Sequence, residues 1–256
     1  MITSNANKQI KWVRSLQSKR NARQNEGMFV IEGTRLIEEV LRSEHKAHLI
    51  LYTTAWGSRN PRLLDQLNQL TMQIELVSDS VLASCSDVET PQGVLAVMPI
   101  SKSKESRKSN TTLILDHLSD PGNLGTILRT ALAAKVGSVY LTSGSVDAFN
   151  PKVVRAGMGA HFYLNIHEAS VDKIFAGIEG QALWIAEARQ GDVYHQVDWR
   201  KPIALAIGSE ARGLDPRFQA LASGQVHIPI GNHSESLNAA TAAAVILFEI
   251  QRQRGS

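Results

Sequence analysis

The stretch Leu113-Ile-Leu-Asp-His-Leu-Ser-Asp-Pro-Gly-Asn-Leu-Gly-Thr-Ile-Leu-Arg129 begins as an apolar strand and passes through a polar, glycine-bearing turn into a helix. In the helical part, apolar residues from Leu124 to Leu132 recur at the spacing of a helix that packs one face on a sheet. The pattern of a strand followed by a polar turn returns twice, in Ile203-Ala-Leu-Ala-Ile-Gly-Ser-Glu-Ala-Arg-Gly-Leu214 and Val226-His-Ile-Pro-Ile-Gly-Asn-His-Ser-Glu-Ser-Leu-Asn238. Because open α/β sheets bind ligands at their strand ends, these three turns are the predicted functional site.

The second half of the chain alternates apolar runs with helical patterns. This alternation predicts an α/β fold, with a mainly parallel sheet covered by helices on both faces. Strands are expected at 112–115, 138–141, 162–166, 183–186, 203–207 and 226–228. A final helix is expected from Ser236 to about Arg252. Its alanine-rich middle is apolar on all sides, so we expect it to be buried, with a second subunit as one way to cover it.

The first hundred residues predict a separate, smaller α/β domain. Strands are expected at 28–31, 48–52, 73–77 and 94–97, helices at 34–41 and 61–70, and a basic helix within residues 1–25. Residues 101–110 have no apolar side chain, which predicts an exposed linker. The expected domains are therefore 1–100 and 111–256.

Composition is that of an ordinary globular protein. Of the 256 residues, 43% are hydrophobic and 20% are charged, and no apolar run reaches the roughly 18 residues of a membrane span. Cys85 is the only cysteine, which excludes internal disulfides and cysteine-cluster metal sites. The eight histidines lack ligand spacing, so no metal is predicted. A cytoplasmic location is the default expectation.

The N-terminus is basic and free of acidic residues up to Asn25. Such a segment can bind nucleic acid through its phosphates. A solvated helix face and an organellar transit peptide are the alternatives that the sequence leaves open. The cationic residues are Lys8, Lys11, Arg14, Lys19, Arg20 and Arg23.

Several common enzyme motifs are missing from the chain. There is no Gly-x-Gly-x-x-Gly after the first strand, which argues against a dinucleotide-dependent oxidoreductase, and no phosphate-binding loop of the Gly-x-x-x-x-Gly-Lys type. A Gly-x-Ser-x-Gly nucleophile elbow is absent as well. The three polar turns are therefore the candidates for chemistry.

Each turn carries polar side chains that have both a structural and a functional interpretation. Asp120-Pro121 is suited to cap and start the helix. Asn123 is either a helix cap or a ligand-binding amide. Arg129, expected near the helix start, is either solvated or able to reach the strand end. Glu210 is either a helix-start acceptor or a functional acid. Ser236 and Asn238 lie where the free N–H groups of the last helix favour an anion or electron-rich ligand. Capping accounts for one of these two residues, but not for both together with their polar neighbours.

The ordered set of motifs closely resembles that of the SpoU (TrmH) family of RNA ribose methyltransferases, in the SPOUT superfamily. The N-terminal part, with Phe29-Val-Ile-Glu-Gly-Thr-Arg-Leu36, is similar to the RNA-binding domain that many members carry. The matching segments of the second half are Asp120-Pro-Gly-Asn-Leu-Gly125 with Arg129, Asn150–Phe162, Gly208-Ser-Glu210 with Gly213-Leu214, Ile228-Pro229, and Ser236-Leu-Asn238.

This resemblance implies transfer of a methyl group from S-adenosylmethionine to a ribose 2′-hydroxyl of RNA. It also implies a homodimer and a SPOUT domain whose C-terminal part forms a trefoil knot, which the general rarity of threaded chains would not predict. The cofactor is expected at Gly208, Ile228 and Leu237. The residues expected around the ribose are Asn123, Arg129, Glu210, Ser236 and Asn238.

The chemistry limits the role of the arginine. A guanidinium is always protonated and offers only donors, so Arg129 is expected to stabilise the developing alkoxide or clamp a phosphate. Glu210 is then expected to orient Arg129 or accept the proton. Ala211 stands where the family commonly has glycine, which puts the loop shape or the cofactor affinity in doubt.

Ribosomal RNA is favoured over tRNA as the substrate because of the sizeable N-terminal domain. The alternatives are a tRNA ribose methyltransferase and a catalytically inactive RNA-binding member. A member without activity has no need to keep Asn123, Arg129, Glu210, Ser236 and Asn238 together.

Overall fold

The computed structural model describes residues 1–43, 45–69, 73–100, 110–209 and 212–255, in two compact units. One unit holds Met1–Lys102 and Phe149–Phe162, and the other holds Ser103–Ala148 and Tyr163–Ser256. Residues 149–162 were expected in the second domain, whereas in the structure they pack with the first unit. Aromatic packing accounts for this placement. The ring centroid of Phe149 lies 5.1 Å from that of Phe29, and the His161 ring packs beside both.

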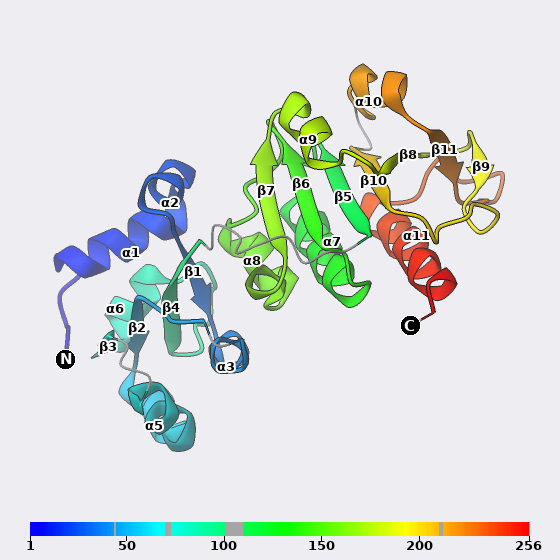
Figure 1. Ribbon diagram of the computed structural model, residues 1–256. Coiled ribbons are helices and arrows are strands. Elements are labelled where there is room, and N and C mark those ends of the chain that lie inside the picture. The colour runs from blue at the N-terminus through cyan, green and yellow to red at the C-terminus, as the bar shows by residue number, and fades with distance from the viewer. Residues whose placement is uncertain (44, 70–72, 101–109, 210–211, 256) are drawn as a thin grey trace. The chain divides into compact units, whose positions relative to one another are not determined.

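A seven-stranded sheet forms the centre of the second unit (Figure 1). Every described strand pair in it is parallel, which confirms the expected sheet type. Strands β5 and β10 lie at its centre and are buried almost throughout, as a sheet covered on both faces requires. The order is β7-β6-β5-β10-β8-β11-β9, with β5 at Thr111–Asp116, β6 at Ser138–Thr142, β7 at Asn165–Ala169, β8 at Ala182–Glu187, β9 at Asp192–Val193, β10 at Ile203–Gly208 and β11 at Gly224–His227.

Helices cover both faces of this sheet. Helices α9 (Val171–Gly177) and α10 (Pro216–Leu221) pack on one face, in a core that includes Ile114 and Ala206. The other two, α7 (Pro121–Ala133) and α11 (Ala239–Gln253), lie side by side (Figure 1). Asp120 caps α7 by accepting a hydrogen bond from the Asn123 N–H at 2.6 Å. Asp120, rather than Asn123, is therefore the capping side chain.

Two sequence-based boundaries are wrong for identifiable reasons. The strand expected at 162–166 begins only at Asn165, because Ala160–Phe162 forms a short 3₁₀ helix whose Phe162 ring packs near that of Phe29. The last helix begins at Ala239 and not at Ser236. Asn238 caps the N-terminus of the helix, because its side chain accepts hydrogen bonds from the N–H groups of residues 240 and 241.

The first unit contains a smaller mixed sheet in the order β1-β4-β2-β3. Its strands are β1 (Met28–Glu32), β2 (Leu49–Tyr52), β3 (Gln73–Leu76) and β4 (Val94–Pro99), and only β2 and β3 pair in parallel. Its helices are α1 (Lys8–Ser18), α2 (Arg20–Glu26), α3 (Thr34–Arg42), α4 (Thr54–Arg59), α5 (Pro61–Gln69), α6 (Asp79–Cys85) and α8 (Pro151–Gly157).

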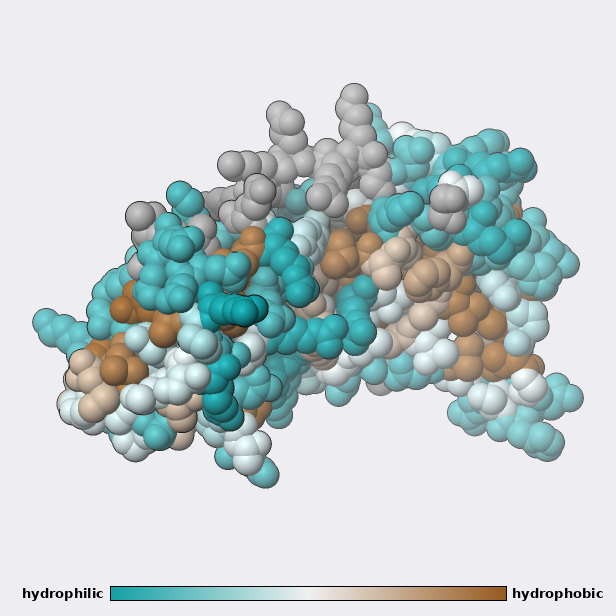
Figure 2. All heavy atoms as spheres, turned by 90° about the horizontal axis from the view of Figure 1, so that it is seen from below, coloured by the Kyte–Doolittle hydropathy of each residue, from teal (hydrophilic) through white to brown (hydrophobic). Residues whose placement is uncertain are grey.

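The basic N-terminal segment is helical, as expected, but it forms two helices. Ile10, Val13 and Leu16 of α1 are fully buried against α6 and the sheet, which leaves the charged side of α1 in solvent. Hydrophilic and apolar side chains are interspersed over the face of the molecule in Figure 2. None of the described helices has the length and apolar character needed to cross a bilayer.

Candidate functional site

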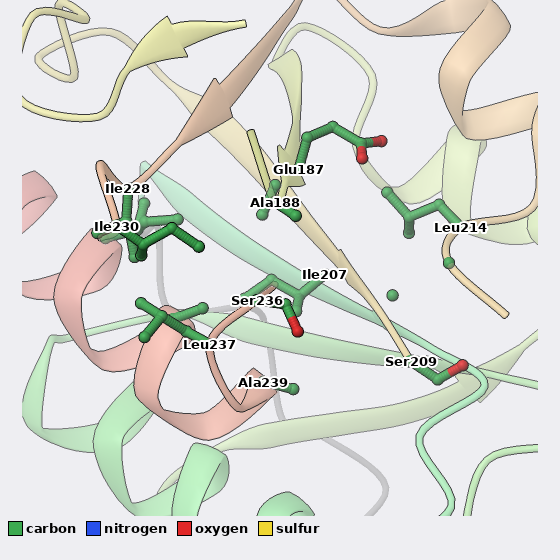
Figure 3. Close-up of a pocket in the computed structure, with 15 residues that line it drawn as sticks. Glu187, Ala188, Ile207, Ser209, Leu214, Ile228, Ile230, Ser236, Leu237 and Ala239 are labelled. Atoms are coloured by element: carbon green, nitrogen blue, oxygen red, sulfur yellow. The ribbon is translucent and has the colours of Figure 1, made fainter. Parts of the chain in front are cut away.

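A pocket opens at the ends of β8, β10 and β11, where the second and third turns meet (Figure 3). Its volume is about 210 Å³. Most of the lining is aliphatic, with Ser209, Ser236 and Glu187 as its polar side chains. The apolar side includes Ile207, Leu214, Ile228, Ile230 and Leu237. Such a lining suits a ligand with a flat or aliphatic body and a few polar groups.

The second turn folds back on itself after β10. Gly213 donates its N–H to the Ser209 carbonyl at 2.9 Å, and the Arg212 N–H donates to Ser209 Oγ at 3.1 Å. A Cβ atom at Gly208 would lie 2.5 Å from the Gly213 carbonyl group, so any side chain there collides with backbone. Gly213 itself has φ +66°, a conformation that favours glycine. Glu210 and Ala211 lie outside the described residues.

A buried carboxylate holds this turn from the neighbouring strand. Asp116 ends β5, is fully buried, and lies opposite Gly208 in the sheet register. Its Oδ1 accepts a hydrogen bond from Thr142 Oγ1 at 2.5 Å and lies 2.7 Å from His117 Nδ1, while its Oδ2 accepts one from the Asp215 N–H at 2.7 Å. A buried carboxylate is tolerated only when it is hydrogen-bonded in this way. Asp116 was not among the predicted site residues, although an acidic residue that ends an apolar strand is a visible signal in the sequence.

The third turn crosses from β11 to α11 and meets the first. Ile228, Ser236 and Leu237 of this turn line the pocket. Asn238, just past them, donates from its Nδ2 to Asn123 Oδ1 at 3.0 Å, across 115 residues of sequence. Asn238 therefore combines the capping role with a link between the first and third turns.

Arg129 does not join this cluster in the structure. It lies in the second half of α7, and not near the helix start as expected. Its side chain is exposed and makes no hydrogen bond or ion pair with the residues that the structure describes. Four predicted residues, Gly208, Ile228, Ser236 and Leu237, line one pocket, with Asn123 and Asn238 linked beside it. No group of side chains in the described ranges has the composition of a metal site.

Comparison with known proteins identifies the fold. Residues 110–248 match the model of the SpoU rRNA Methylase family. The chain belongs to the SpoU rRNA methylase family. The match spans all three turns, so the predicted site residues lie within the family region. Residues 7–96 match a second model, the MRM3-like substrate binding domain.

Relatives of this SpoU chain match along almost its whole length. It is 34% identical to a tRNA/rRNA methyltransferase of Synechocystis, over 99% of this chain and 94% of that protein. It is 32% identical to the 23S rRNA (guanosine(2553)-2′-O)-methyltransferase RlmP of Bacillus subtilis, over 98% of both. An AdoMet-bound rRNA methyltransferase structure from Sinorhizobium meliloti is 27% identical, with a TM-score of 0.87 and coverage of 100% of this chain and 98% of that one.

Proposed function

We propose that this SpoU family member transfers a methyl group from S-adenosylmethionine to a ribose 2′-hydroxyl of ribosomal RNA. The observation that carries the proposal is the pocket itself: the two turns that follow β10 and β11, both inside the family region, form its walls. The relative RlmP is named for 2′-O-methylation of a 23S rRNA guanosine, which supports the same reaction and substrate class.

The lining of the pocket supports this choice of cofactor. Its aliphatic walls suit an adenine ring and a methionine chain, and the backbone of Gly208 approaches closely because no side chain fits there. The Glu187 carboxylate on the same pocket favours a cationic ligand such as a sulfonium. We assign Gly208, Ile228 and Leu237 to cofactor binding. The cofactor supplies the electrophilic methyl group.

The protein's part in the reaction is to position the ribose and manage its proton. Asn123 and Asn238 are already held together and would bind the ribose with Ser236 at the pocket edge. Arg129 would stabilise the negative charge that develops on the ribose oxygen, since it cannot act as a base. Glu210 would accept the proton or orient Arg129. Alignment of the ribose oxygen with the methyl group lowers the activation barrier by several kcal/mol.

We further propose that the enzyme is a homodimer with sites at the subunit interface. The exposed position of Arg129 on α7 supports this, because a partner subunit can bring its pocket to that guanidinium. Helix α11, beside α7, carries Phe248, a large hydrophobic side chain that is exposed in the single chain and that a partner subunit would cover. The C-terminal part of the second unit would form the trefoil knot of the SPOUT fold, and the N-terminal unit would bind RNA.

The test is an incubation of the purified protein with labelled S-adenosylmethionine and RNA from cells that lack it. We expect label on a ribose of ribosomal RNA and none on tRNA. Arg129→Ala should abolish transfer and leave the cofactor Kd nearly unchanged, whereas Arg200→Ala, which removes another exposed arginine, should be active. Equal loss of cofactor binding and transfer in Arg129→Ala would contradict its assigned role. Label on tRNA alone would make this a tRNA enzyme.

A further inference from the structure

A second hollow lies in the first unit, between α1 and the end of α6. Its volume is about 420 Å³. Lys11, Arg14 and Lys19 line one wall, and Ser84 and Ser86 lie on the other. The side chains of Lys11, Arg14 and Ser18 share one side of α1, since they are three and seven residues apart.

The charges in this hollow are unbalanced. None of the three cations forms an ion pair with a carboxylate in the described part of the chain, and all three are exposed. The single carboxylate on the lining, Asp87, is paired with Arg155 at 3.1 Å. Burial raises the pKa of the Cys85 thiol, so that group adds no negative charge. The hollow therefore attracts an anion.

The hydroxyl groups indicate how the anion is held. Ser15 and Ser18 donate to carbonyl oxygens of α1, and Ser86 donates to Glu32 Oε1 at 2.6 Å. Because these hydroxyl protons already form hydrogen bonds within the protein, the lysine and arginine side chains are the donors available to an anion. Charge-assisted hydrogen bonds from lysine and arginine are also the stronger ones.

We propose that the hollow binds the sugar-phosphate backbone of the RNA substrate, with Lys11, Arg14 and Lys19 as the phosphate contacts. From Lys11 to Ser18 the helix rises about 10 Å, which suits a strand of linked phosphates better than one small anion. Such contacts position an RNA without reading its sequence. The inference rests on the proposed methyltransferase function, for which it names the residues that hold the substrate.

The experiment compares two triple variants of the full chain. Lys11→Gln, Arg14→Gln and Lys19→Gln remove the proposed contacts, while Lys46→Gln, Arg59→Gln and Arg62→Gln remove three other exposed cations of the same unit. Binding to ribosomal RNA from cells lacking the protein is measured by filter retention over a range of salt. In the first variant, we expect the negative slope of log K against log salt to become shallower by roughly 2, because phosphate contacts are lost. The Kd for RNA should rise on the order of tenfold. The control should keep a slope near that of the wild type.

The RNA-binding comparison is read together with the cofactor Kd, the Tm and methyl transfer. Cofactor Kd and Tm should be unchanged in both variants, since the substituted side chains are exposed. Equal changes in the Kd for RNA and in the salt slope of both variants would mean that the unit attracts RNA without a defined site. Unchanged values in the first variant would mean that the hollow does not bind RNA. Either result overturns the inference. Methyl transfer by the wild type is measured in parallel, so its failure would refute the proposed function separately.

Discussion

Replacement of Gly208 by alanine tests the architecture of the cofactor pocket with a single methyl group. The added Cβ would lie 2.5 Å from the Gly213 C and O atoms and 2.8 Å from the Leu214 N atom. Ordinary van der Waals contact begins at 3.4 Å, and both obstacles are backbone, so the turn from 208 to 214 has to move by roughly 1 Å. That turn supplies Ser209, Gly213 and Leu214 to the pocket.

The cost of such overpacking is about 1–3 kcal/mol. If this cost destabilises the cofactor-bound protein relative to the free protein, the Kd for S-adenosylmethionine rises by roughly 5- to 150-fold. Isothermal titration of the purified variant measures this directly. Gly231→Ala is the matched control, because a Cβ there meets nothing within 4 Å and the φ angle is ordinary. A Gly208→Ala protein that binds the cofactor as tightly as the wild type would refute both the clash and the placement of the cofactor.

Two further predictions concern buried carboxylates. Thr142→Val removes a donor to buried Asp116 and should lower the free energy of unfolding by about 1–3 kcal/mol, while Thr142→Ser, which keeps the hydroxyl, should lose less; equal losses in urea unfolding would contradict this. Hydrogen bonds from Arg252 lower the pKa of Glu249 from 4.5 to about 2, against the opposing effect of burial. The stability that Glu249 contributes is therefore complete above about pH 5 and is lost as the pH falls through 4.5 towards 2. Glu249→Gln should be less stable than the wild type at pH 6, with a smaller difference at pH 3; a constant difference would show that the ionised carboxylate does not matter.

Local patterns determined much of this protein. The apolar runs fixed the positions of the central strands, and Asp120-Pro121 marked the start of α7. Because parallel strands end at one edge of a sheet, the sequence also predicted that the three turns would form one site. The second and third turns line the pocket, and the first is joined to the third by the Asn238–Asn123 hydrogen bond. Hydrophobic periodicity reports which residues are buried, and that information is carried by neighbours in the chain.

Contacts between distant segments were decided only by the tertiary structure. The hydrogen bond from Asn238 to Asn123 and the one from the Asp215 N–H to Asp116 join residues 115 and 99 positions apart, and both depend on how the backbone folds, which periodicity does not encode. The packing of Phe149 on Phe29 likewise moved residues 149–162 into the first unit. A side chain's partner is set by three-dimensional proximity, and pattern along the chain gives only the face on which it lies.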